Sequence, residues 1–221
     1  PDPLGHLDLD DDTALFNDFF VKGELVFEVI NATSLEKYWP ILGSRRAHFT
    51  SVQEHSGTPA TIQKLKADAA LSRRQLLATP TDPNCTRNVG GVAMIARYHD
   101  SMYEISPRTD AFRHARDRGR LMHVACSIGH HRYLSHIIVY GHTGGAGSRQ
   151  TAKRTNLLFD TIRQELAAHT MGPRLITGDF NVEPRHLDVL KETLEDGWSD
   201  LACAGSPHCE PTCLTATAKN S

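Results

Sequence analysis

A short apolar strand that runs into a polar turn, Arg174–Pro184, constrains the fold more than any other stretch of this sequence. Its apolar first half favours a buried strand, and Gly178 lets the backbone turn where a side chain would clash. Asp179 and Asn181 are two residues apart, so they project to the same side of an extended backbone. A carboxylate and an amide held side by side at a strand end can orient a water molecule and a phosphate group. We therefore expect a functional site at the end of this strand.

The composition is that of a folded domain. The chain has 221 residues, of which 39% are hydrophobic and 23% are charged, so a packed core is expected and extensive disorder is not. The net charge of −2 gives no overall basic field that would argue for nucleic acid, although local patches could still bind it. No apolar run approaches the ~18 residues that a membrane span requires, so we expect no membrane partner. Nothing in the composition indicates an oligomeric state.

The five cysteines favour reduced thiols over a disulfide framework, because their number is odd. This predicts an intracellular setting, which includes the nucleus. Cys203, Cys209 and Cys213 lie close to His208, but their spacing fits no usual structural zinc site. The first dozen residues are acidic, so no signal peptide is visible. We expect residues 1–23 to form a tail or linker before a domain that covers residues 24–221.

Strand-like and helix-like segments alternate along the whole chain, without an internal repeat. Ser34 and Thr58 are suitable helix caps, and Pro59 suits the first position of a helix. This alternation predicts one α/β domain with mixed sheets. The expected strands are 24–30, 48–53, 75–79, 89–97, 121–128, 133–140 and the strand before Asp179, and the expected helices are 35–42, 59–69, 149–169 and roughly 184–196.

Residues 106–120 form the most basic part of the chain. Such a run is most often a solvated surface, and the alternative is a contact surface for phosphates. Under that alternative Arg113, Arg116 and Arg118 are the candidate substrate-binding residues. The glycine-rich loop Gly141–Gly147 is usually only a connection. Its N–H groups could instead approach an anion, although no phosphate-loop lysine follows.

Five polar residues stand at the ends of expected strands: Asn31, Glu54, Tyr140, Asp179 and Asn181. The first three have ordinary structural explanations, as a turn residue, a solvated strand end and a half-buried aromatic. The functional alternatives are a Mg²⁺ ligand for Glu54 and a phosphate contact for the Tyr140 hydroxyl. In a sandwich of sheets, strand ends on one edge can line one cleft.

These motifs resemble those of the endonuclease/exonuclease/phosphatase superfamily, which has the DNase I-like fold. The match covers roughly residues 24–215 in the family's order. The residues around Glu54 and Asp179 are similar to those of endonuclease domains found beside reverse transcriptases. The matching segments are Thr177–Asn181 (the GDFN motif), Ser51–Glu54 (the QE motif), Val29–Asn31, Asn88–Ile95 and Ile138–Tyr140.

The resemblance implies a four-layer α/β/β/α sandwich with its active site at one rim. It also implies hydrolysis of nucleic acid, with DNA as the expected partner, that depends on Mg²⁺ or Mn²⁺. Glu54 would bind the metal, while Asn31 and Asn181 would orient the metal shell and the scissile phosphate. Asp179 would align or deprotonate the attacking water, and Tyr140 would donate a hydrogen bond to a phosphate oxygen. The alternatives are the phosphatase or phospholipase branch of the superfamily and an inactive remnant that binds nucleic acid.

The sequence departs from the family at its C-terminal end. Residues 211–215 resemble the segment that precedes the family's Ile–Asp–Tyr/Phe strand, but neither that strand nor the following Ser–Asp–His strand is present before Ser221. We therefore expect a sandwich without its last strands, with unpaired sheet edges. Loss of the histidine that stabilises the transition state commonly costs about 10²–10³ in rate. A fragment, a piece of a polyprotein or a decayed copy would each explain this pattern.

Overall fold

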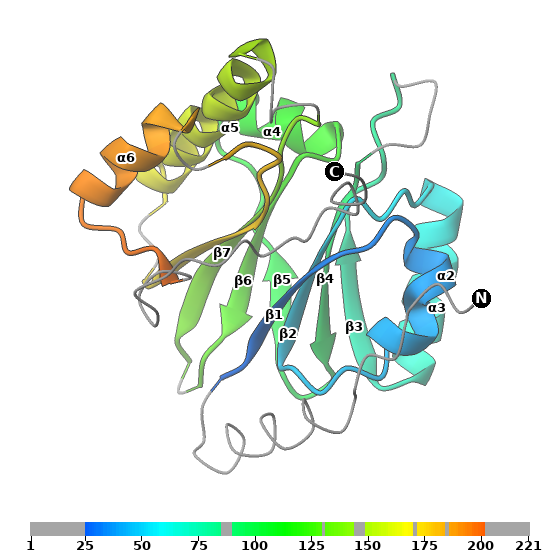
Figure 1. Ribbon diagram of the computed structural model, residues 1–221. Coiled ribbons are helices and arrows are strands. Elements are labelled where there is room, and N and C mark those ends of the chain that lie inside the picture. The colour runs from blue at the N-terminus through cyan, green and yellow to red at the C-terminus, as the bar shows by residue number, and fades with distance from the viewer. Residues whose placement is uncertain are drawn as a thin grey trace, which may run out of the picture.

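Two four-stranded β-sheets packed face to face form the centre of the protein (Figure 1). The computed structural model describes residues 25–84, 90–129, 131–143, 149–169, 172–183 and 186–201. Within these residues the first sheet has the strand order β1-β2-β4-β3 and the second has the order β5-β6-β7-β8. The strands are β1 Phe27–Asn31, β2 Phe49–Gln53, β3 Arg74–Ala78, β4 Val92–Arg97, β5 Met102–Glu104, β6 Leu121–Ser127, β7 Tyr133–Tyr140 and β8 Arg174–Asp179.

Helices cover the outer face of each sheet. Helices α2 and α3 lie on the first sheet, α4 and α5 lie on the second, and α6 packs beside α5 (Figure 1). The architecture is therefore the predicted α/β/β/α sandwich. None of the helices in the described part of the chain has the length and apolar character needed to cross a bilayer. The helices are α2 Leu35–Leu42, α3 Pro59–Leu71, α4 Asp110–Asp117, α5 Arg149–Ala167 and α6 Asp188–Glu195.

The helix starts follow from the capping residues. The Ser34 hydroxyl accepts a hydrogen bond from the Lys37 backbone N–H at 3.3 Å, and the Thr58 hydroxyl accepts one from Thr61 at 3.2 Å. Pro59 occupies the first turn of α3, where its missing N–H is not needed. The predicted caps are thus confirmed.

Alternate residues of the inner strands enter different layers of the core. On β4, Val92 and Met94 face the second sheet, whereas Ala93 and Ile95 pack under α2 and α3. All four are buried, as expected for a strand covered on both faces. Tyr140 at the end of β7 belongs to the layer between the sheets.

A polar contact joins the two sheets inside this middle layer. The Ser51 hydroxyl on β2 lies 3.2 Å from the Thr177 hydroxyl on β8. The Thr177 hydroxyl also lies 2.7 Å from Nε2 of His136 on β7. Ser51 and His136 are buried, so their hydrogen bonds offset the cost of removing these polar groups from water.

The structure contains two elements that the sequence analysis does not predict, namely helix α4 in the basic region and the short strand β5 just before that region. Helix α4 begins at the Thr109 cap and buries only Phe112 and Ala115. Two apolar residues in a highly charged segment give too weak a periodic pattern to indicate a helix. The expected helix over 184–196 begins later, at Asp188, and Pro184 lies outside the described residues.

Several other expectations also fall outside the described residues. These are the N-terminal tail over residues 1–23, the cysteine group with His208, the family-like segment 211–215 and most of the glycine-rich loop.

Candidate active site

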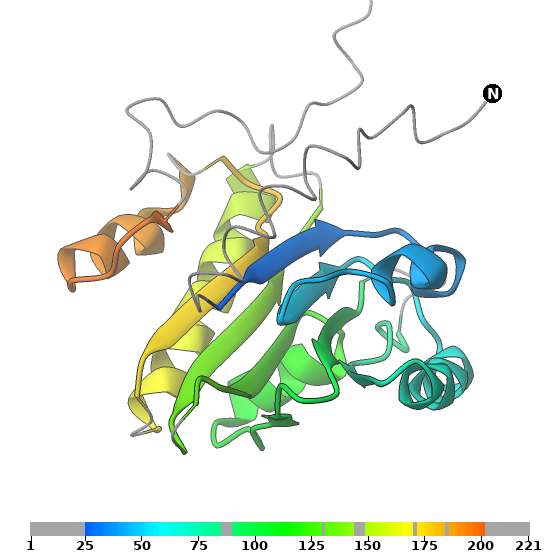
Figure 2. The ribbon, with the colours of Figure 1, turned by 90° about the horizontal axis from the view of Figure 1, so that it is seen from below.

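The ends of four strands meet at one edge of the sandwich. Strands β1 and β2 are parallel, and their last paired residues are Asn31 and Gln53. Strands β7 and β8 are also parallel, and their last paired residues are Tyr140 and Asp179. Strands β1 and β8 each lie at one edge of their sheet, and they lie next to each other (Figure 2). This arrangement brings polar residues from distant parts of the sequence together.

Asp179 is held at both of its carboxylate oxygens. The side-chain amide of Asn31 donates a hydrogen bond of 2.6 Å to Oδ2, and the backbone N–H of Asn181 donates one of 3.0 Å to Oδ1. The Asn181 side chain donates to the Gly141 carbonyl at 3.3 Å. Asn181 has a φ of 54°, a left-handed conformation that asparagine tolerates better than most residues. The carboxylate is therefore fixed in one orientation.

Two glycines let the backbones around Asp179 approach closely. A Cβ atom at Gly178 would lie 2.0 Å from the Val139 carbonyl oxygen, and one at Gly141 would lie 2.0 Å from the Phe180 carbonyl oxygen. Gly178 was predicted to allow a turn. It instead lies within β8, which continues to Asp179, and its φ of 152° lets the strand pass close to β7.

Glu54 and Tyr140 form the other half of the site. Glu54 follows β2 directly in a left-handed conformation, with a φ of 58°, and is half-buried. Tyr140 is fully buried, and its hydroxyl makes no hydrogen bond of ordinary geometry. Burial and then the Glu54 carboxylate raise the pKa of Tyr140 above its usual value, so the phenol stays protonated. The predicted contact between this hydroxyl and a phosphate stays a prediction.

Arg120 connects the two halves, although the sequence analysis does not select it as a site residue. Its guanidinium carbon lies 4.8 Å from the centre of the Tyr140 ring, which is a cation–π contact. Its Nη1 donates a hydrogen bond of 2.9 Å to the Gly141 carbonyl, which also accepts from Asn181. Arg120 thereby positions both Tyr140 and the turn after Asp179.

Positive charge gathers around His142, two residues after Tyr140. Burial and then the charges of Arg120, Arg154 and Arg118 lower the pKa of His142 to about 4. The charges of three arginines thus act on one histidine. Arg154 lies on α5, and no local pattern in the sequence marks it.

The three predicted substrate-binding arginines lie in different environments. Arg116 forms a two-pronged ion pair with Glu104 on β5, at 2.7 and 3.1 Å. Arg113 pairs with Asp110 on its own helix. Arg118 is exposed and close enough to His142 to affect its pKa. The structure gives Arg113 and Arg116 partners on the protein itself, and the role of Arg118 in substrate binding stays a prediction.

The polar groups at this edge have the chemistry of a magnesium site. Glu54 and Asp179 supply carboxylate oxygens. The Asn31 amide nitrogen donates to Asp179, so its carbonyl oxygen is a further possible ligand. Mg²⁺ prefers one or two carboxylates together with phosphate oxygens and waters. The residues present fit such an ion, and their individual roles stay a prediction.

Comparison with known proteins identifies the fold. No protein-family model matches the chain, and no curated protein sequence does. An AP endonuclease from Archaeoglobus fulgidus has a similar structure, with 14% identity, coverage of 88% of this chain and 80% of that one, and a TM-score of 0.67. The AP endonuclease LMAP from Leishmania major has 12% identity, coverage of 77% and 66%, and a TM-score of 0.54. Beta toxin from Staphylococcus aureus has 13% identity, coverage of 77% and 71%, and a TM-score of 0.53. The chain has the DNase I-like fold, as its motifs predict.

Proposed function

We propose that this chain hydrolyses phosphodiester bonds in nucleic acid, with DNA as substrate, and that it requires a divalent metal ion. The observation that supports this most is the fixed Asp179 carboxylate, which accepts hydrogen bonds from the Asn31 side chain and from the Asn181 backbone. A carboxylate held in this way is suited to align a water molecule for in-line attack on phosphorus. The fold of the two AP endonucleases is consistent with the proposal.

Glu54 and the Asn31 carbonyl oxygen would hold Mg²⁺ or Mn²⁺. When bound, the ion supplies positive charge that polarises the phosphoryl group and stabilises the leaving oxygen. Asp179 would orient the attacking water and accept its proton, while Asn181 would help to orient the scissile phosphate. Tyr140 and Arg120 would shape the floor of the site.

The arginines around His142 favour a phosphate-rich polymer over a small substrate. Arg118 and Arg154 are exposed, and both contribute to the lowered pKa of His142, so they would contact phosphates that flank the cleaved bond. Contacts of this kind position the substrate without reading its sequence. The resemblance of the Glu54 and Asp179 motifs to reverse-transcriptase-associated endonucleases makes DNA the substrate that we propose.

Nicking of supercoiled plasmid DNA tests the proposal. The purified chain should nick the plasmid with Mg²⁺ and stop when a chelator is added. An Asp179→Asn variant should be slower by about 10²-fold or more, because the water loses its base. Asp188→Asn is the matched control, since Asp188 is exposed in the first turn of α6.

Three outcomes would overturn or redirect the assignment. Equal nicking by the wild type and by Asp179→Asn would show that the site is not responsible. Hydrolysis of a phosphoinositide or of sphingomyelin without nicking would favour the phosphatase or phospholipase branch. Salt-sensitive DNA binding without any cleavage would indicate a protein that only binds nucleic acid.

A further inference from the structure

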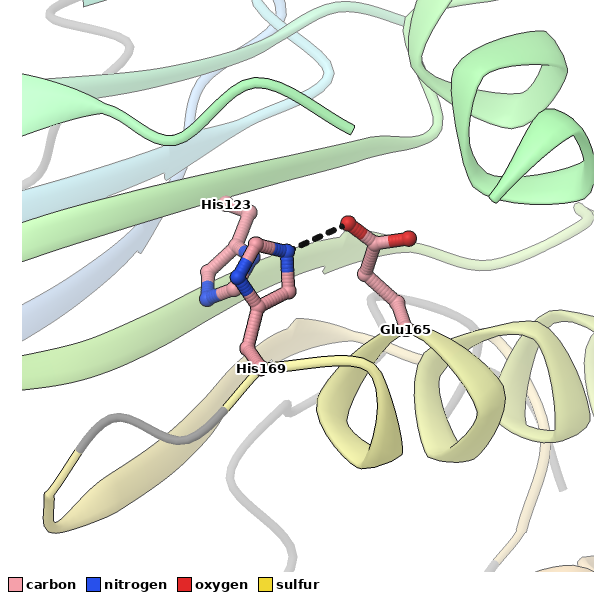
Figure 3. Close-up of side chains that lie close together, drawn as sticks. All are labelled: His123, Glu165 and His169. Carbon is pink, nitrogen blue, oxygen red and sulfur yellow. Dashed lines mark hydrogen bonds and ion pairs between the residues drawn. The ribbon is translucent and has the colours of Figure 1, made fainter. Parts of the chain in front are cut away.

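A second group of ligand-type side chains lies on the outer face of the second sheet, under α4 and α5. It consists of His123 on β6, Glu165 near the end of α5 and His169 just after that helix (Figure 3). One nitrogen or oxygen atom from each residue lies within 4.8 Å of those of the others. The three residues are 1%, 0% and 7% exposed. Buried ionisable groups gathered in this way require a specific partner.

We propose that His123, Glu165 and His169 bind one Zn²⁺ ion or a similar transition-metal ion. Two imidazole nitrogens and one carboxylate oxygen are the donor set that zinc accepts and that Mg²⁺ does not prefer. A water molecule would complete a tetrahedral shell. The site differs in place and in chemistry from the oxygen-rich edge around Glu54 and Asp179.

The contacts of His123 give the strongest evidence for the proposed metal site. Its Nε2 lies 2.6 Å from the Ser135 hydroxyl, whereas its Nδ1 is buried without a hydrogen-bond partner. Figure 3 shows the His123 ring beside the His169 ring, and the two rings meet edge to face with centres 5.0 Å apart. An imidazole with one nitrogen fixed by a hydroxyl is prepared for metal binding at the other nitrogen.

Glu165 is fixed equally well from outside the group. Its Oε1 accepts from the Arg108 backbone N–H at 2.8 Å, and its Oε2 accepts from the backbone N–H and the hydroxyl of Thr109 at 2.9 and 2.7 Å. These bonds orient the carboxylate as the outer shell of a metal site does. They also join Glu165 to the start of α4.

His169 contacts Glu165 directly, with 2.9 Å between Nε2 and Oε1. An ion that enters between these atoms takes the place of the hydrogen bond, and the neutral His169 ring then binds through Nε2 and carries its proton on Nδ1. Without an ion, this hydrogen bond and the contacts to α4 account for Glu165 and His169 as a helix-capping pair. They do not account for the unpartnered Nδ1 of His123, and the ion does.

The proposed ion would join β6 to the end of α5, and the hydrogen bonds of Glu165 extend this connection to the start of α4. Helix α4 leads directly to Arg120, which positions Tyr140 at the candidate active site. The ion would therefore stabilise the scaffold of that site without taking part in the reaction.

Metal titration of the chelator-treated, untagged chain tests the proposal. The variant is His123→Gln, which removes one ligand and leaves the contacts between Glu165 and α4. The matched control is His136→Gln on the neighbouring strand, because His136 is also buried and also has an unpartnered Nδ1 but faces the opposite side of the sheet. We expect one Zn²⁺ per chain for the wild type and for His136→Gln by calorimetry, and a loss of that binding for His123→Gln.

Two further measurements are independent of activity. Zinc at about 100-fold above its Kd should raise the unfolding temperature of the wild type and of His136→Gln by about 5–10 °C, with no rise for His123→Gln. Co²⁺ added to the wild type should give the intense visible absorption of a tetrahedral ion, which decides the question even if a variant does not fold. Absence of that absorption, or equal zinc binding by wild type and His123→Gln, would overturn the site.

Discussion

The Asn31 side chain donates a 2.6 Å hydrogen bond to Asp179 across 148 positions of sequence. Asn31 ends β1 in one sheet, and Asp179 ends β8 in the other. The carboxylate that we propose as the water-positioning group is therefore oriented correctly only when the two sheets are docked. The proposed nicking activity should therefore depend on the packing of the two sheets as well as on the site residues themselves.

Replacing Asn31 tests this dependence. Asn31 is exposed, so Asn31→Ala should leave the unfolding free energy nearly unchanged. Plasmid nicking should fall by about 10²-fold, because Asp179 loses one of its two orienting donors. Thr33→Ala, an exposed change two residues later, should nick at the wild-type rate. Wild-type activity in Asn31→Ala would remove this hydrogen bond from the proposed site.

Tyr140→Phe should separate stability from activity. The variant keeps the buried ring and its contact with Arg120 but removes a hydroxyl that has no hydrogen-bond partner of ordinary geometry. Urea unfolding should show unchanged stability or a gain of up to ~1 kcal/mol, since a desolvated polar group is removed. Nicking should decrease if the hydroxyl contacts the substrate during the reaction. A large loss of stability would instead mean that the hydroxyl has a structural partner.

Gly178 should tolerate no side chain. Gly178→Ala places a Cβ atom 2.0 Å from the Val139 carbonyl oxygen, so β7 and β8 must separate. We expect a loss of at least ~2 kcal/mol in urea unfolding and loss of nicking. Gly197→Ala is the control, because Gly197 also has a positive φ but has open space around it, and it should cost only about 1 kcal/mol. Similar costs for the two variants would show that backbone conformation, not the close approach, determines the effect.

Stability should fall on acidification because of buried neutral histidines. Burial, and then the His123 charge, lower the pKa of His136 from 6.5 to about 3. The unfolded chain therefore takes up this proton more readily than the folded chain does. The resulting loss begins as the pH falls below about 6.5 and continues to about 3, at ~1.4 kcal/mol per pH unit. Urea unfolding between about pH 7 and about pH 5 should show this slope. The slope for His136→Gln should be smaller than that of the wild type by the contribution of His136. An unchanged slope would contradict the lowered pKa of His136.

DNA affinity should depend on the arginines near His142 rather than on those paired along α4. Arg118→Ala and Arg154→Ala should each weaken binding to a DNA duplex in Ca²⁺ and reduce the salt slope by about 1. Arg113→Ala should bind like the wild type, because Arg113 already pairs with Asp110. Titrations at several salt concentrations measure both quantities. If Arg113→Ala weakened binding and Arg154→Ala did not, the DNA would follow α4 instead.

Much of the fold can be predicted from the sequence, because local signals and packing agree. The caps at Ser34 and Thr58 mark two helices, and long buried strands such as β4 and β6 have continuous apolar runs. Helix α4 could not be predicted, since its only buried residues, Phe112 and Ala115, lie among charges. Its position depends on Glu165, a contact between residues far apart in the sequence.

The candidate site could likewise be predicted only in part from the sequence. Asn31, Glu54 and Asp179 stand next to recognisable motifs at strand ends, so their chemistry was visible in the sequence. The hydrogen bond between Asn31 and Asp179 could not be predicted from the sequence, because it depends on how the two sheets face each other. Arg120 and Arg154 lacked any motif, and the cluster around His123 joins a strand to a distant helix end.

The Ser51–Thr177 contact has a consequence for how precisely the two sheets are positioned relative to each other. Apolar side chains attract without direction, so two sheets that meet only through them can slide slightly at little cost. A hydrogen bond between two short hydroxyl side chains does not permit such sliding. Ser51 lies three residues before Glu54, and Thr177 lies two residues before Asp179. This contact therefore limits changes in the distance between the two carboxylates, which the proposed reaction would require to be correct within about 0.5 Å.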